Sequence, residues 1–258
     1  MTAPSVRVVE YLALQYRHTW RGHFVSTFVN PLLFLGAMGY GLGSLVDRQV
    51  GEATLGGLDY VQFVGPGILA ANAMQSAASQ NAWPLMAAFR WRDTFGAAAS
   101  TPITPADLAA GQIGWTAIRS LFGASVFAAT LAVFGVAAFP GSILAVVAAV
   151  LTGLAFAGPM AAFTATRDSD AGFNVIFRFG VTPMFLFSGT FFPVSQLPDW
   201  LEPLAWATPL WHGVELCRGL VLEDLASGKA LGHVAYLGLW AGVGFWLAAR
   251  YFTKRLWK

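Results

Sequence analysis

Residues 142–166 read SILAVVAAVLTGLAFAGPMAAFTAT, a run of 25 residues without a charged side chain. A helix needs about 20 mostly apolar residues to cross a lipid bilayer. The glycines and the proline within the run do not argue against a helix, because spanning helices tolerate both. The run therefore predicts a transmembrane helix, and with it a membrane protein.

Five other stretches have comparable length and apolar character. They are Phe24–Val46, Tyr60–Ala82, Leu108–Val136, Gly172–Phe191 and Leu231–Phe252. The composition agrees, since 56% of the 258 residues are hydrophobic and only 11% are charged, against about 25% charged residues in an average globular protein. An aromatic content of 14% excludes a disordered chain. The connections are too short for a soluble domain, so we expect one all-α polytopic membrane domain, residues 1–258, with six transmembrane helices.

Lysine and arginine are divided unequally between the two sides of the predicted membrane. If the N-terminus lies inside, the inner segments hold Arg7, Arg17, Arg21, Arg90, Arg92, Arg167, Arg178, Arg250, Lys254, Arg255 and Lys258, whereas the outer segments hold Arg48, Arg218 and Lys229. Cytoplasmic loops attract positive residues. We therefore expect both termini to be cytoplasmic.

The N-terminal segment, residues 5–22, has the pattern of an amphipathic helix. Its apolar face repeats every fourth residue, at Val8, Leu12, Tyr16 and Trp20, while Arg7 and Arg17 lie on other faces. Such a helix lies flat on a membrane, with aromatic rings at headgroup depth and arginines toward anionic lipid. The segment is either a plain anchor or a docking surface for a cytoplasmic partner.

The inner segment around residues 86–97 combines aromatic and charged side chains. Phe89, Trp91 and Phe95 could fill a partner's groove, as short helices do in many complexes. The charged side chains Arg90, Arg92 and Asp93 would then form ion pairs at the rim of that contact. The alternative is an ordinary positively charged loop. Thr104 and Pro105 are suited to cap and start the next helix.

The outer segment, residues 191–230, is too apolar for a solvated loop and too rich in proline to span. It predicts short helices broken at Pro198, Pro203 and Pro209, which enter the outer leaflet under protein cover. The charged residues that would return the chain to water are Glu215, Arg218, Glu223 and Asp224.

Polar side chains inside spans are costly and face protein or water. Asn72, Ser76 and Ser79 share one helical face. Each polar residue could instead join helices. Arg119 lies about a dozen residues inside its span, so we expect a carboxylate or carbonyl partner for it. The glycine pairs Gly39/Gly43 and Gly238/Gly242 have the spacing of close helix contacts.

Several chemistries have no motif in this sequence. A phosphate-binding loop G-x-x-x-x-G-K-[ST] is missing, as are the serine-hydrolase and zinc-protease motifs. The four histidines are scattered, and Cys217 is the single cysteine, so no disulfide or metal spacing exists. We therefore expect neither a catalytic residue, a bound metal nor a nucleotide site in this chain.

Four motifs resemble one known family. They are NPLLFLGAMGYGLG at residues 30–43, YVQFVGPG at 60–67, PMFLFSGTFFPVSQLP at 183–198 and PLWHGVELCR at 209–218. With the N-terminal helix and six spans, they are similar to the membrane subunits of type-two ATP-binding-cassette exporters, especially the nodulation-type and daunorubicin-type permeases. The resemblance covers essentially the whole chain.

The resemblance implies a mechanism and roles for particular residues. Two permease copies form a pathway in a bacterial cytoplasmic membrane, and two separate ATPase subunits, which use ATP and magnesium, dock underneath. Residues 5–22 would be the interface helix and 89–95 the coupling helix. The candidate pathway residues are Asn30, Phe34, Asn72, Gln75, Ser76, Ser79 and Asn174. The candidate outer gate is Phe187, Phe191, Phe192 and Trp200.

The abundance of Phe and Trp favours an amphipathic substrate: a drug, a lipid or a lipid-linked glycan. Two other hypotheses remain at this stage. A membrane enzyme acting on lipid would need convergent acid, base or metal groups, which the spans do not supply. A membrane scaffold would tolerate loss of the inner aromatic segment.

Overall fold

The computed structural model describes residues 3–37, 41, 58–136, 140–224 and 226–257, and for residues 20–26, 30 and 31 it describes only the helical backbone. The described residues form helices and no strands. The elements are α1 (Pro4–Gly36), α3 (Tyr60–Gln80), α4 (Trp83–Met86), η3 (Ala87–Trp91), α5 (Thr94–Ala99), α6 (Pro105–Val133), α7 (Gly141–Ala165), α8 (Ala171–Ile176), η4 (Phe177–Val181), α9 (Thr182–Phe187), η5 (Val194–Gln196), α10 (Glu202–Trp206), α11 (Pro209–Val221) and α12 (Ser227–Leu256).

Three of the described helices are long and apolar enough to cross a membrane, namely α6, α7 and α12. They correspond to the third, fourth and sixth predicted spans. Helix α6 starts as its sequence predicts, because Thr104 Oγ1 accepts the N–H of Asp107 and Pro105 occupies the first turn. The other three predicted spans correspond to the end of α1, to the more polar α3 and to the helical run α8–η4–α9.

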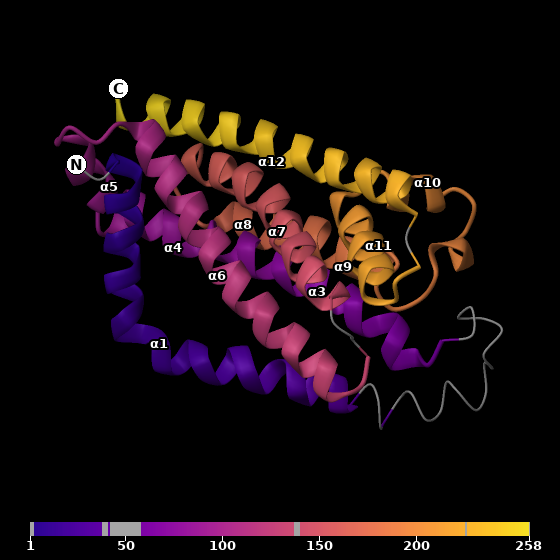
Figure 1. Cartoon of the computed structure of the whole chain (residues 1–258). Helices are drawn as coiled ribbons and strands as arrows, with labels where there is room; N and C mark the ends of the chain where they lie inside the picture. The colour runs from indigo at the N-terminus through magenta and orange to yellow at the C-terminus, as the bar shows by residue number, and fades with distance from the viewer. Residues whose placement is uncertain (1–2, 38–40, 42–57, 137–139, 225, 258) are drawn as a thin grey trace.

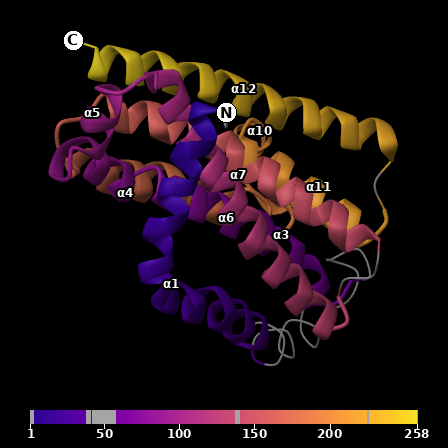
Figure 2. The same ribbon diagram turned by 60° about the vertical axis from the view of Figure 1, so that its left-hand side comes forward.

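Helix α7 lies at the centre of the bundle and packs against α3, α6, α11 and α12 (Figures 1 and 2). It is in tight contact with α12 at Gly158 and Gly244. A Cβ on Gly244 would lie 2.3 Å from Pro159 Cδ, so only glycine permits this contact. The predicted contact at Gly238 and Gly242 is wrong, since both face open space. Gly39 and Gly43 lie outside the described residues.

Helix α1 is one helix that bends, where the sequence predicts a surface helix at 5–22 and a separate span at 24–46 (Figure 1). The residues of that span beyond 37 lie almost entirely outside the described part. The first arm packs along α6, because a Cβ on Gly111 would lie 2.5 Å from Val8 Cβ. The apolar stripe of this arm is thus covered at Val8 by protein.

The fifth predicted span, 172–191, is shorter in the structure. The helical run covers residues 171–187 and includes a wide turn at Phe177–Val181 just before Pro183. Proline lacks an N–H to donate to the preceding turn, and a wider turn accommodates that loss. The run ends at Ser188, before Gly189 with φ of 76°, a conformation suited to glycine. The chain then reverses through η5 and α10 into α11.

A buried polar network joins three helices where α3 ends. Asn81 Nδ2 donates to Thr116 Oγ1 of α6 at 3.1 Å, and Asn81 Oδ1 accepts from Gln112 Nε2 at 3.3 Å. Thr164 Oγ1 of α7 donates to the Asn81 carbonyl at 2.7 Å. Because buried polar groups need partners, this network fixes the place where the chain leaves α3 for the segment at 83–99.

Candidate functional site

The two chain ends, α4 and α5 lie together at one end of the bundle (Figure 1), which we call the terminal end. The segment Trp83–Ala99 forms a knuckle there, consisting of α4, η3 and α5. Its turn is at Asp93, whose φ of 46° is left-handed, a conformation that aspartate adopts more readily than most residues. The predicted coupling region thus lies beside both termini.

The prediction that Phe89, Trp91 and Phe95 all face a partner is wrong for two of the three. Phe89 and Phe95 are buried, and both contact Phe252 of α12, with ring centroids 4.9 and 6.1 Å away. They hold the knuckle to the bundle because burial of these rings removes apolar area from water. Trp91 is 63% exposed, so it alone of these rings remains available to a partner.

An arginine from α12 fastens the same end. Arg255 lies over the Phe89 ring at 4.7 Å and donates to the carbonyls of Thr164, Ala165 and Arg167 at the end of α7. Cations are favourable at helix C-termini, where free carbonyls gather. Asp168 Oδ1 then lies 3.3 Å from Arg90 Nη2 and 3.9 Å from Arg255 Nη2. The knuckle is therefore held to α12 by the packing of Phe89 and Phe95 on Phe252, and to the turn after α7 by the ion pair between Arg90 and Asp168.

The charged side chains predicted at this rim are exposed. Arg90, Arg92 and Asp93 all face solvent, as do Lys254 and Trp257 at the end of α12. Of the predicted interface helix, Arg7 and Arg17 are exposed, and the side chain of Trp20 lies outside the described part. The terminal end therefore presents exposed positive side chains and two exposed tryptophans, Trp91 and Trp257.

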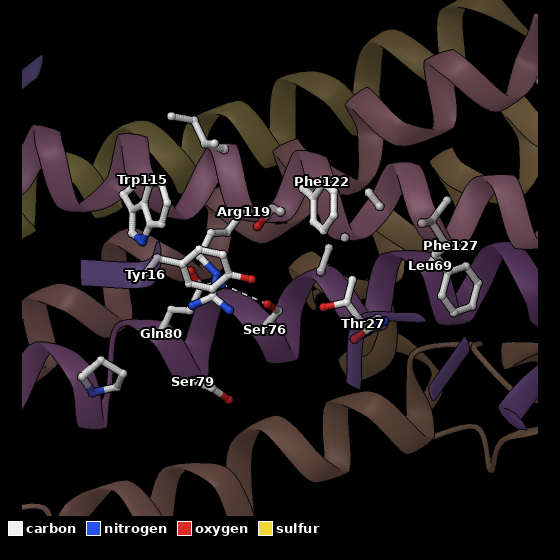
Figure 3. Close-up of a pocket in the computed structure, with 17 residues that line it drawn as sticks. Tyr16, Thr27, Leu69, Ser76, Ser79, Gln80, Trp115, Arg119, Phe122 and Phe127 are labelled. Carbon is white, nitrogen blue, oxygen red and sulfur yellow. Dashed lines mark hydrogen bonds between the residues drawn. The ribbon is translucent and has the colours of Figure 1, made fainter. Parts of the chain in front are cut away.

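A cavity of about 670 Å³ lies between α1, α3 and α6. Figure 3 shows its lining, with Tyr16, Ser76, Ser79, Gln80, Trp115 and Arg119 in one half and Thr27, Leu69, Phe122 and Phe127 in the other. The predicted shared face of Asn72, Ser76 and Ser79 does line this cavity. Gln75 and Asn174 do not line it, Phe34 packs against the core, and the side chain of Asn30 is not described.

Arg119 occupies the middle of α6, fourteen residues from either end. The sequence predicts a carboxylate or carbonyl partner, and the structure instead gives a ring, since the guanidinium lies 4.7 Å from the Tyr16 centroid. The ion pairs among the described residues involve Arg90, Arg218 and Arg255 only. An arginine at a bilayer centre costs about 2.5–3.5 kcal/mol, and a cation–π contact returns about 0.5–2 kcal/mol. Tyr16 therefore offsets only part of that cost.

At the opposite end, a second arginine is fully partnered. Arg218 donates to the carbonyls of Phe63 at 3.1 Å and Gly189 at 2.7 Å, and Nη1 lies 2.6 Å from Glu215 Oε1. The prediction that the charges of this segment return the chain to water is wrong for Arg218, which is buried over the Phe63 ring, whereas Glu223 and Asp224 are exposed. The arginine joins α11 to α3 and to the corner at Gly189. No local pattern in the sequence indicates this role.

The predicted outer gate residues do not form one group. Phe191 contacts Phe185, with ring centroids 4.9 Å apart, and Phe192 packs into a small cluster with Val194. Phe187 is partly exposed, and Trp200 is 74% exposed. Short helices do occur in the outer segment, but Pro203 and Pro209 start α10 and α11 rather than break them. Proline suits a first turn because its missing N–H has no helical acceptor there.

Comparison with known proteins adds a family. The family model described as ABC-2 type transporter matches residues 8–222. Nodulation protein J of Sinorhizobium fredii is 32% identical over 90% of this chain and 86% of its own length. Nodulation protein J of Bradyrhizobium diazoefficiens is 28% identical over 94% of this chain and 90% of its own length. The protein of the same name from Rhizobium meliloti is 28% identical over 90% of this chain and 86% of its own length.

Proposed function

The chain belongs to the ABC-2 type transporter family, and we propose that it is the membrane subunit of an ATP-driven exporter in a bacterial cytoplasmic membrane. Two copies form the pathway, and separate ATPase subunits bind the terminal end and supply the energy of ATP hydrolysis. The family match carries the transport function. The exposed surface around Trp91 is the observation from which we infer where the ATPase binds.

In this arrangement the terminal end is cytoplasmic and six segments cross the membrane. They are the second arm of α1, then α3, α6, α7, the run α8–η4–α9, and α12. The face of α12 supports contact with lipid, because Leu239, Trp246 and other large apolar side chains along it are exposed. The substrate is an amphipathic molecule, which suits a pathway built from aromatic and small polar side chains.

The knuckle carries force because it is attached to the bundle on one side only. Phe89 and Phe95 pack against α12, while Trp91 projects from the other side. A movement of the ATPase against Trp91 is then passed to α12 through the buried rings. Exposed aromatic anchors of this kind contribute much of the binding free energy in protein interfaces.

The experiment is co-purification of the chain with its ATPase and measurement of the dissociation constant. We expect W91A to weaken binding about tenfold to thirtyfold, since a central interface tryptophan contributes about 2 kcal/mol. W200A is the matched control, because Trp200 is also largely exposed, at 74%, and lies at the opposite end. Equal binding by W91A, W200A and the wild-type chain would refute the docking surface.

Two other functions differ from transport in how they depend on the ATPase. A membrane scaffold would keep its function after W91A. A lipid-modifying enzyme would act on lipid without an ATPase. The described residues contain no cluster of three or more His, Cys, Asp or Glu side chains placed to hold a metal, and nothing in the cavity favours either function over transport.

A further inference from the structure

The cavity between α1, α3 and α6 has two chemically different halves. Figure 3 shows Arg119, Gln80 and Ser76 gathered at one end, with Tyr16 over the guanidinium. Phe122, Phe127 and Leu69 form the other end. A polar end with one positive charge followed by an apolar end matches the shape of an amphiphile.

The polar end contains hydrogen-bonding atoms without partners. Gln80 is 93% buried, since only 7% of it is exposed, and its Nε2 donates to Ser76 Oγ at 2.9 Å. Its Oε1 has no partner among the described residues, and neither does Ser120 Oγ, which lines the same cavity. An unpartnered buried oxygen is costly, so this end is complete only when a ligand supplies a donor.

The charge at the polar end also lacks a counter-ion. Arg119 faces a ring, and no described carboxylate lies within ion-pair distance of it. Guanidinium groups bind phosphate, sulfate and carboxylate through paired N–H donors. A neutral or cationic ligand would leave this charge uncompensated.

We propose that this cavity binds an acidic amphiphile. Its phosphate, sulfate or carboxylate accepts from Arg119, and a neighbouring hydroxyl or amide donates to Gln80 Oε1. Its apolar chain lies against Phe122 and Phe127. Because eight residues of α6 separate Arg119 from Phe127, the apolar part extends about 12 Å past the acid. The inference that the acidic amphiphile is the exported substrate rests on the proposed function. The inference that the cavity binds an acidic amphiphile does not.

The test measures binding to the full chain in phosphatidylcholine nanodiscs by isothermal titration. Dodecyl phosphate is the probe, and dodecylphosphocholine is the same chain with its negative charge balanced. We expect dodecyl phosphate to bind at least tenfold more tightly, and R119Q to remove that difference. R250Q is the matched control, since Arg250 also lies over an aromatic ring on a long helix and does not line the cavity.

A second variant keeps the charge and tests the unpartnered oxygen. Lauroyl lysophosphatidic acid adds a hydroxyl donor near the phosphate. We expect Q80L to weaken this probe about threefold to tenfold and to leave dodecyl phosphate unchanged. Equal affinity of the wild-type chain for dodecyl phosphate and dodecylphosphocholine would overturn the proposal, as would R119Q binding like R250Q.

Measuring ATP hydrolysis with the ATPase present distinguishes an exported substrate from a resident lipid as the acidic ligand. If dodecyl phosphate stimulates ATP hydrolysis and R119Q abolishes the stimulation, the site holds exported substrate. If it binds without stimulation, the site holds a resident acidic lipid, and the binding proposal stands. Failure of the ATPase to co-purify would remove the proposed function alone, because the nanodisc titration contains only this chain.

Discussion

Replacing Arg218 tests how the corner at Gly189 is held. R218M keeps an unbranched apolar side chain and removes the three guanidinium nitrogens that donate hydrogen bonds. The carbonyls of Phe63 and Gly189 then lose their partner, and Glu215 loses its counter-charge. Breaking a buried ion pair by removing one partner costs about 3–5 kcal/mol. For a chain of this size that loss corresponds to a fall of about 6–20 °C in melting temperature.

The chain carries its own reporter for this measurement. Cys217 is the single cysteine and is fully buried beside Arg218, so a thiol-reactive fluorescent maleimide labels it only on unfolding. R178M is the control, because Arg178 is exposed and exposed substitutions change stability by about 0.5 kcal/mol or less. The double variant R218M/E215M should recover part of the loss, since an apolar pair needs no counter-charge.

A melting temperature for R218M within 2 °C of R178M, by the scale of about 2–4 °C per kcal/mol, would refute this reasoning. So would a double variant less stable than R218M, because Glu215 would then have another essential partner. R218K separates charge from geometry. It keeps the positive charge but not the planar fork, so its melting temperature should fall between those of the wild-type chain and R218M.

Two further substitutions test the packing with the same Cys217 reporter. G244V inserts a side chain where a Cβ would already lie 2.3 Å from Pro159; we expect a loss of about 1–3 kcal/mol, against no comparable loss for G242V, which faces open space. N81L removes the side-chain hydrogen bonds to Thr116 and Gln112 of α6 and should cost about 2 kcal/mol, and N174L, at an exposed position, is its control. Equal melting temperatures within either pair would contradict the packing described.

The long apolar helices could be predicted from the sequence because their signal is local. Helices α6, α7 and α12 each carry enough consecutive apolar residues to define a span without knowledge of their neighbours. The start of α6 was equally local, since Thr104, Pro105 and Asp107 lie within one turn. Helix α3 shows the opposite case, because its polar side chains lower its hydropathy while they line the cavity.

The direction in which side chains point could not be predicted, because it depends on distant partners. Phe89 and Phe95 read as exposed anchors beside charged residues, and they turn inward only because Phe252, more than 150 residues later, offers an apolar surface. Arg218 is predicted to return the chain to water because its partners are likewise distant in the sequence. Its acceptors, at Phe63 and Gly189, are supplied by other parts of the chain.

Glycine spacing failed as a predictor for a different reason. The chain has 28 glycines, so a four-residue spacing occurs often by chance. Only the packing angle of two helices decides which glycine lies at the contact, and here that glycine is Gly244 rather than Gly242. Small residues permit close approach, but they do not determine where it happens.

Two arginines with unequal partners lead to opposite expectations for stability. Arg218 meets three acceptors, whereas Arg119 meets one ring. R119M removes a membrane cost of about 2.5–3.5 kcal/mol and a ring contact of about 0.5–2 kcal/mol. The free energy of unfolding should therefore rise by about 0.5–3 kcal/mol, and the melting temperature should rise with it, as expected when a residue serves binding at the expense of stability. The Cys217 labelling assay measures the melting temperature of R119M in phosphatidylcholine nanodiscs without added ligand. A fall as large as that of R218M would mean that Arg119 has a structural counter-ion, and the cavity would then have no free charge to offer an acidic ligand.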